Sequence, residues 1–239
     1  MRKNIPNLIT LANLFSGCIA ITMAFEGNFT AVTVWVIVAA LFDFLDGVFA
    51  RWLNAYSDTG KELDSLADVV SFGVAPAAAV FVLLRDYTLL PSMAERLQLY
   101  IPYIAFLIPL FSALRLAKFN IDERQTTSFK GLPTPANGLF WVSFTVAVSG
   151  IAGSNKIVFP VIVILVILLC WLMISELSMF SLKIKNISLK GNERQWIMAV
   201  IMVVFVSLWG LSGIAWGILA YIALSLVTAT KSLNNTNHS

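Results

Sequence analysis

Charged residues are scarce in this chain of 239 residues, where lysine, arginine, aspartate and glutamate together make up 12%. Soluble domains carry about a quarter charged residues, so the composition argues against a soluble fold. Hydrophobic residues make up 59%, and they form long continuous runs rather than the alternating pattern of a membrane β-barrel. Because helices satisfy their own backbone groups in lipid, the sequence predicts an all-α integral membrane protein.

Histidine and cysteine are nearly absent as well. The single histidine, His238, lies in the polar C-terminal stretch NNTNHS, which argues against histidine-based catalysis. The two cysteines, Cys18 and Cys170, fall within apolar runs, so we expect small buried side chains rather than a disulfide or a metal pair. A net charge of +3 does not favour nucleic acid as a partner.

Long apolar segments account for most of the chain. They predict about eight transmembrane helices, at approximately 8–25, 31–52, 62–84, 99–117, 136–152, 157–175, 195–210 and 212–230. The connections are short, so we expect one polytopic domain over 1–230, followed by a polar tail at 231–239. No small-residue cleavage pattern follows the first apolar run, so this run is expected to remain as the first helix.

Lysine and arginine are distributed unevenly between the predicted loops. With a cytoplasmic N-terminus, thirteen of the sixteen fall in cytoplasmic segments, as the positive-inside rule requires. We therefore expect the cell (cytoplasmic) membrane as the location and an N-terminus facing the cytoplasm. The C-terminal end of the second helix then lies at the cytoplasmic surface.

Four aspartates stand in or beside apolar helices, where carboxylates are costly and usually functional. Asp43 and Asp46 are three residues apart, and Asp64 and Asp68 are four apart, so each pair occupies one helix face. The two helices follow one another in sequence, so both acidic faces are expected to meet near the cytoplasm. Oxygen ligands without histidine or cysteine favour hard cations, Mg²⁺, Mn²⁺ or Ca²⁺, and four carboxylates could hold two ions.

Small and basic residues accompany these aspartates. Gly47, Ala50 and Gly60 would let a substrate approach the backbone closely, and Arg51 offers a fixed positive charge suited to phosphate. The set predicts a phosphate or diphosphate site. The alternatives are polar contacts between helices, or a transporter of protons or divalent cations. A transporter should show polar helices in a second, related half, and the segments after residue 136 carry almost no intramembrane charge.

The spaced motif Asp43-x2-Asp46-Gly47-x2-Ala50-Arg51-x8-Gly60-x3-Asp64-x3-Asp68 resembles the signature of the CDP-alcohol phosphotransferases. The resemblance implies a six-helix core, here with two additional helices, a homodimer, and two divalent ions held by the four aspartates. It makes Asp68 the general base. It also implies a CDP-binding site, whose expected residues are Asn7 and Thr10 of a Pro-Asn-x-x-Thr element, Gly47, Ala50, Arg51 and Gly60, and Ser57 in the intervening loop.

Three further stretches, SLADVVSFGVAPA (65–77), RLAKFN (115–120) and FKGLPTPAN (129–137), resemble the phosphatidylserine synthase branch of that family. The implied reaction transfers a phosphatidyl group from CDP-diacylglycerol to L-serine and releases CMP, with the active site facing the cytoplasm. Basic residues should bind the serine carboxylate, and the candidates are Arg115, Lys118, Asn120 and Lys130. Topology signals or lipid-headgroup contacts would explain the same charges. Glycerol 3-phosphate or inositol phosphate remains an alternative acceptor.

Overall fold

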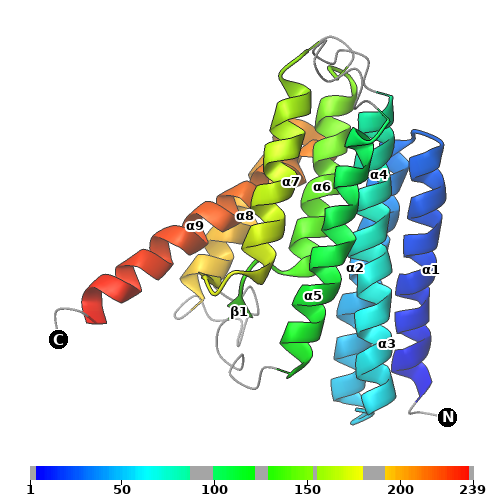
Figure 1. The fold of residues 1–239 in the computed structure, drawn as a ribbon. Coiled ribbons are helices and arrows are strands. Elements are labelled where there is room, and N and C mark those ends of the chain that lie inside the picture. The colour runs from blue at the N-terminus through cyan, green and yellow to red at the C-terminus, as the bar shows by residue number, and fades with distance from the viewer. Residues whose placement is uncertain (1–3, 87–98, 122–128, 153–154, 180–191, 237–239) are drawn as a thin grey trace.

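The computed structural model describes residues 4–86, 99–121, 129–152, 155–179 and 192–236 (Figure 1). Two 3₁₀ turns, Ile101–Phe106 and Gly210–Ser212, precede α5 and α9. A π-helical turn at Val69–Val74, called the π segment below, joins α3 to α4. The helices are α1 (Ile5–Phe25), α2 (Phe29–Trp52), α3 (Asp58–Asp68), α4 (Ala75–Arg85), α5 (Leu107–Ile121), α6 (Thr134–Ser149), α7 (Val158–Ile174), α8 (Glu193–Trp209) and α9 (Gly213–Thr236).

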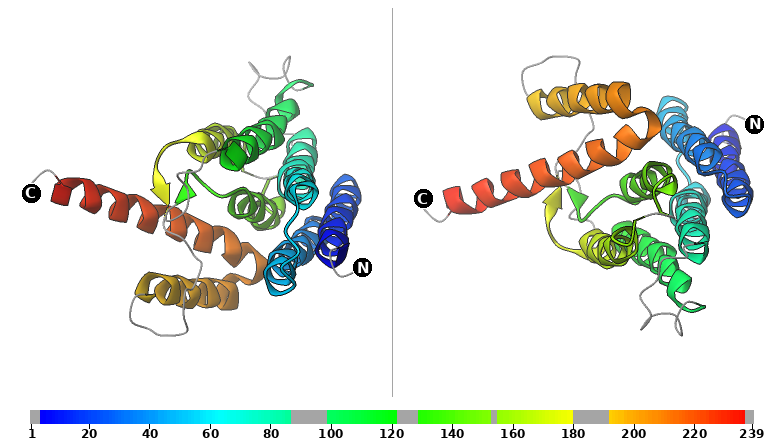
Figure 2. Two further views of the ribbon diagram at one scale, coloured as in Figure 1. Left: turned by 90° about the horizontal axis from the view of Figure 1, so that it is seen from below. Right: turned by 90° about the horizontal axis from the view of Figure 1, so that it is seen from above.

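The helices α1 to α7 stand side by side as a bundle, and α9 leans away from it with α8 beside it (Figures 1 and 2). The start of α1, the end of α2, the start of α3 and the end of α5 share one end of the bundle (Figure 1). This end also carries a short antiparallel pair of strands, β1 (Phe129–Lys130) and β2 (Ser178–Met179). The strands were not expected from the sequence.

Local signals fix the ends of the helices that carry the acidic motif. The Asn28 side chain caps α2 by accepting a hydrogen bond from the Ala31 amide, and Ser57 caps α3 by accepting one from the Gly60 amide, each at 3.0 Å. Gly27, with φ +71°, makes the tight turn between α1 and α2 that most side chains would strain. The Ser57 cap fixes the start of α3 directly after the loop that follows α2, whereas the Asn28 cap fixes the opposite end of α2.

The all-helical, membrane-type prediction is confirmed, and the molecule is an integral membrane protein. Its described residues hold five helices long and apolar enough to span a bilayer, plus one shorter apolar helix, Val158–Ile174. The prediction of eight spans goes further than these criteria support. The helix α6 has only 16 residues and includes Asn137 and Ser143, and Glu193–Val227 counts as one apolar run of 35 residues. Large apolar side chains such as Phe15, Phe44 and Ile164 are exposed, as a lipid-facing surface requires.

Close backbone contacts surround the π segment. Ala75 donates its amide to the carbonyl of Val70, five residues back, and Pro76 cannot donate to the carbonyl four residues before it. A Cβ built on Gly73 would lie 3.1 Å from the Cα of Pro109, and one built on Gly138 would lie 2.8 Å from the Cα of Phe72. The absence of side chains at Gly73 and Gly138 therefore lets α5 and α6 pack closely against the π segment that follows Asp68.

One expectation about a single residue differs from the structure. Cys170 is buried as predicted, whereas Cys18 is exposed, because its side chain lies on the face of α1 turned away from the bundle core. The helix α9 continues to Thr236, and the division into a domain over 1–230 and a polar tail at 231–239 stays a prediction. His238 and the basic residues at positions 183–190 lie outside the described residues.

Candidate active site

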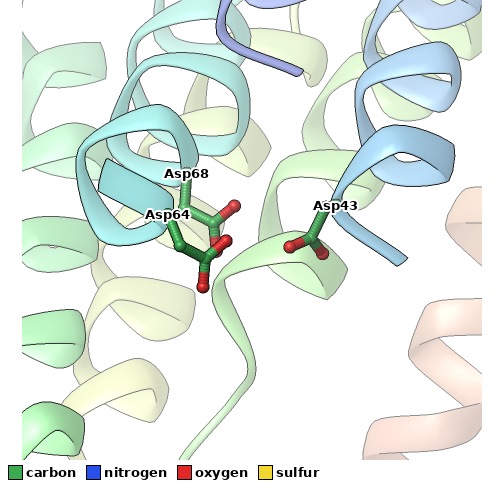
Figure 3. A group of neighbouring side chains, drawn as sticks. All are labelled: Asp43, Asp64 and Asp68. Atoms are coloured by element: carbon green, nitrogen blue, oxygen red, sulfur yellow. The ribbon is translucent and has the colours of Figure 1, made fainter. Parts of the chain in front are cut away.

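Three aspartates meet between α2 and α3. One carboxylate oxygen from each of Asp43, Asp64 and Asp68 lies within 4.8 Å of the others, and their carboxylates point toward one another (Figure 3). Asp68 is buried, at 6% exposed, and the other two are half-buried. The prediction that the two acidic faces meet at one depth is therefore confirmed for these three residues.

The fourth aspartate, Asp46, is held slightly apart by α1. Thr10 donates its hydroxyl to Asp46 Oδ2 at 2.6 Å, and Asn13, one turn further along α1, donates its amide to Asp68 Oδ1 at 3.4 Å. Asp46 remains within electrostatic range of Asp64. A polar face of α1 thus orients one carboxylate from each of the two acidic helices.

The three-aspartate cluster fits a divalent cation. Within the described part of the chain, no lysine or arginine forms an ion pair with its carboxylates. Asp64 Oδ1 is buried and lacks a hydrogen-bond partner, an arrangement that costs free energy unless a cation or water is supplied. The donors are all hard oxygen atoms, which suit Mg²⁺ or Mn²⁺.

A cavity of about 210 Å³ opens beside the carboxylates, between α1, α2 and the start of α3. The predicted nucleotide residues Asn7, Thr10, Gly47, Ala50, Ser57 and Gly60 line it, together with Asp46 and Asp64. Its wall also contains Pro6, the first residue of the Pro-Asn-x-x-Thr element, and three residues to which the sequence assigned no role in the site, Ala55, Tyr56 and Lys61. The structure therefore brings the two glycine positions and the α1 element to one surface.

Close spacing explains why a residue without a side chain stands at Gly60, whereas Gly47 has ordinary contacts. A Cβ on Gly60 would lie 3.0 Å from both Asn7 Oδ1 and Ser57 Oγ, so a side chain would crowd the cavity wall. A Cβ on Gly47 would lie 3.6 Å from a terminal nitrogen of Arg51. The exposed Arg51 guanidinium thus lies along Gly47, next to the cavity, although Arg51 is not among the residues that line it.

Basic residues form a second, much smaller hollow between α5, β1 and the end of α7. Arg115, Lys118 and Lys130 line it, together with Glu176. Arg115 is 7% exposed, donates to the Thr134 hydroxyl at 3.3 Å, and lies 5.3 Å from the centre of the Phe119 ring. It is also within electrostatic range of Asp68. Arg115 is thus a buried cation of the basic hollow whose charge interacts with that of Asp68.

The fourth acceptor-side candidate, Asn120, is placed elsewhere. Its side-chain amide donates to Ser65 Oγ at 2.9 Å, and its backbone carbonyl accepts from Lys61 Nζ at 2.8 Å. Asn120 does not line the basic hollow. Its contacts instead attach the end of α5 to α3.

Glu176 is the anion of this hollow. Its carboxylate accepts from Lys118 Nζ at 3.2 Å and from Lys130 Nζ at 2.6 Å. The hydrogen bonds from Lys130 and Lys118 lower the pKa of Glu176, in that order of size. Glu176 is 58 residues from Lys118 and 46 from Lys130 in the sequence, and its carboxylate joins the two lysines.

Residues 3–182 match the CDP-alcohol phosphatidyltransferase family. The chain belongs to this family. As a phosphatidyltransferase it is an enzyme, and this excludes the alternative of a transporter built on the same carboxylates. The acidic cluster lies where a family member would hold its divalent metal.

Several relatives of this phosphatidyltransferase are named CDP-diacylglycerol–serine O-phosphatidyltransferase. The one from Bacillus subtilis (strain 168) is 38% identical over 148 residues, which cover 59% of this chain and 76% of that protein. The one from Methanocaldococcus jannaschii is 36% identical over 174 residues, which cover 73% of this chain and 72% of that protein. An archaetidylserine synthase from Methanothermobacter thermautotrophicus is 33% identical over 142 residues, 59% of this chain and 57% of that protein.

Two further side chains make polar contacts at the phosphatidyltransferase site, although the sequence had assigned them no role. Asn13 stands three residues after Thr10, and this spacing could have identified it as a second polar contact on the same helix face. Glu176 gives no such signal, because its partners Lys118 and Lys130 are 58 and 46 residues away in the sequence.

Proposed function

We propose that this phosphatidyltransferase transfers the phosphatidyl group of CDP-diacylglycerol to the hydroxyl group of L-serine, giving phosphatidylserine and CMP. One observation carries the proposal beyond the family assignment. The buried Arg115 lies within electrostatic range of Asp68 and also lines a basic hollow with Lys118 and Lys130. In this proposal, the carboxylate of the amino acid binds in the hollow and its hydroxyl group extends toward the aspartates. The names of the relatives support the same acceptor.

In this proposal, the cytidine and diphosphate occupy the 210 Å³ cavity, and the acyl chains remain in the bilayer. Asn7, Ser57 and the Gly60 backbone approach one another within this cavity wall and offer polar contacts to the nucleotide. Arg51 supplies a positive charge for a phosphate oxygen. Gly47 and Ala50 leave room for the diphosphate to approach α2 closely.

Asp43, Asp46, Asp64 and Asp68 would hold the divalent ions, Mg²⁺ or Mn²⁺, two per site. When bound there, such ions supply positive charge that stabilises the diphosphate and the departing CMP. Thr10 and Asn13 keep the carboxylates of Asp46 and Asp68 in orientation.

Asp68 acts as the general base in the proposed reaction. It takes the proton of the serine hydroxyl as the serine oxygen bonds to the phosphatidyl phosphorus and the bond from that phosphorus to the CMP oxygen breaks. Arg115, Lys118 and Lys130 together bind the serine carboxylate and thereby position the hydroxyl. The buried position of Asp68 limits competition from water.

The orientation, location and assembly of the enzyme are part of the same proposal. The site lies at the bundle end that holds the start of α1 and the end of α2 (Figure 1), which the distribution of lysine and arginine assigns to the cytoplasm. We propose a homodimer in the cell membrane, with one domain over residues 1–230 and water-soluble serine entering from the cytoplasm.

The test is CMP release by the purified full chain in detergent with CDP-diacylglycerol and Mg²⁺ or Mn²⁺. L-serine is expected to raise the rate at least tenfold, and glycerol 3-phosphate and inositol phosphate are expected to leave it unchanged. Asp68→Asn should abolish CMP release while retaining the wild-type elution volume. Asp86→Asn, an exposed carboxylate at the end of α4, is the matched control and should keep full activity. If serine does not accelerate CMP release by the wild-type protein, the serine assignment is wrong.

A further inference from the structure

The carboxylate of Glu176 lies between two lysines in the basic hollow, where an acceptor carboxylate would be expected to bind. Its two oxygens are used separately, Oε1 by Lys118 at 3.2 Å and Oε2 by Lys130 at 2.6 Å. The ammonium groups of Lys118 and Lys130 are therefore already bound to a carboxylate of the protein itself.

The backbone around this ion pair is held firmly. β1 and β2 pair Lys130 with Ser178, and the Gly131 amide donates to the carbonyl of Leu177 at 2.9 Å. Gly131 has φ +71°, and a Cβ there would collide with the carbonyl oxygen of Met173. The backbone segments that carry Lys130 and Glu176 are therefore fixed side by side. Only the side chains of these residues can move to admit a ligand.

The hollow is too small for an amino acid as it stands. Its volume is about 10 Å³, roughly the space that a single water molecule needs. The side chains of Lys118 and Glu176 are 54% and 60% exposed, so they can turn outward without disturbing the core. Entry of an acceptor therefore requires that the ion pairs of Glu176 rearrange.

We propose that Glu176 recognises the α-ammonium group of a zwitterionic acceptor, whose carboxylate takes the place of the Glu176 carboxylate at Lys118 and Lys130. This inference rests on the proposed function and names the feature of the acceptor that the site selects. No covalent bond is made or broken in the exchange. The lysines keep a carboxylate partner, and Glu176 gains an ammonium partner.

The charges of the hollow explain why a zwitterion is selected. Arg115, Lys118 and Lys130 face one anion, Glu176. An acceptor with a carboxylate but no ammonium would displace Glu176 and leave it without a cation in the hollow. An acceptor with an ammonium but no carboxylate would leave the lysines and Arg115 without a new partner. Only an acceptor with both groups completes the exchange.

The test compares two acceptors that differ in the ammonium group alone. Wild type and Glu176→Gln are assayed for kcat/KM with L-serine, and for inhibition of serine transfer by 3-hydroxypropionate, which keeps the carboxylate and the hydroxyl. In the variant we expect kcat/KM for serine to fall about tenfold or more, and 3-hydroxypropionate to bind equally well or more tightly. Glu176→Asp, which keeps the charge, should recover part of the preference.

Asp86→Asn serves as the matched control, because it also removes an exposed, ion-paired carboxylate. It should change neither kcat/KM for serine nor inhibition by 3-hydroxypropionate. If Glu176 only stabilises the fold, Glu176→Gln affects serine and 3-hydroxypropionate alike. Selectivity is taken from kcat/KM for serine and from the inhibition constant of 3-hydroxypropionate. The inference is overturned if Glu176→Gln reduces the selectivity for serine over the analogue by less than tenfold. It is also overturned if the analogue inhibits neither protein. Absence of serine-dependent CMP release by the wild type would instead refute the proposed function itself.

Discussion

Replacing Gly138 with alanine tests whether the backbone contacts around the π segment set the position of Asp68. Gly138 lies in α6, against the Cα, Cβ and carbonyl oxygen of Phe72. A Cβ there would lie 2.8 Å from these atoms, whereas ordinary contact begins at 3.4 Å, and 3.4 Å less 2.8 Å leaves a shortfall of 0.6 Å. Phe72 is fully buried, so either the π segment or α6 must move to remove the clash, and we expect the π segment to move.

The expected effect follows from where that displacement goes. Phe72 is four residues from Asp68 on a continuous helix. If the Phe72 backbone moves by about half an ångström, we expect the Asp68 carboxylate to move by a similar distance. Misplacement of a catalytic group by about 1 Å costs on the order of a hundredfold in rate, so we expect kcat to fall by about ten- to a hundredfold. Overpacking of this kind also costs about 1–3 kcal/mol of stability.

The assay is CMP release from CDP-diacylglycerol with saturating L-serine, together with a thermal melt in detergent. Gly150→Ala is the matched control, because Gly150 ends the same helix, has φ −72°, and has no atom within 4 Å of an added Cβ. It should retain wild-type kcat and stability. A Gly138→Ala protein with kcat within twofold of the wild type would refute the idea that α6 positions Asp68 through the π segment.

Three further predictions concern the carboxylates. Thr10→Val removes the buried hydroxyl that donates to Asp46 at 2.6 Å, and should cost about 1–3 kcal/mol of stability and lower kcat about tenfold. Removing divalent ions with EDTA should abolish CMP release, and added Mg²⁺ or Mn²⁺ should restore it. In an NMR titration of its labelled carboxyl, Glu176 should protonate below its ordinary pKa of 4.5. Its ion pairs then persist above that range and are lost as the pH falls through the lowered pKa. Lys130→Ala should shift the midpoint upward.

Each of these predictions has a clear contrary outcome. Thr22→Val is the control for Thr10, because the Thr22 hydroxyl bonds only within α1 and is exposed; equal losses in both variants would contradict the role of the Asp46 contact. Full activity in EDTA would contradict the metal assignment. A Glu176 midpoint at or above 4.5 would mean that the lysines do not pair with it in solution.

The acidic site could be predicted from the sequence because local geometry determines most of it. Spacings of three and four residues put Asp43 with Asp46, and Asp64 with Asp68, on single helix faces. A short loop then forces the two helices to lie side by side. The grouping of three carboxylates, with Asp46 turned to Thr10, depends on a contact across 36 residues that no local spacing encodes.

The acceptor side was harder to predict for the same reason. The sequence marked Arg115, Lys118, Asn120 and Lys130 by charge and polarity alone, and the structure separates Asn120 from the other three. Lys118 and Lys130 share the carboxylate of Glu176, which follows the end of α7. The two-residue pairing of β1 with β2 brings it close to Lys130, and so short a pairing has no recognisable sequence pattern. Such a contact depends on how whole helices pack, which residue types do not reveal.

The π segment also has a consequence for how this chain can change in length. Each residue turns an α-helix by about 100°, so the extra residue in the Val69–Val74 turn sets the angular phase between α3 and α4. Deleting one residue there would relax the turn into ordinary helix and rotate Asp64 and Asp68 by that angle against the buried face of α4. Loss of a single apolar residue, with every ligand still present in the sequence, would thus point the carboxylates away from Asp43. We therefore expect the length of this segment to be under stricter constraint than the identity of its side chains.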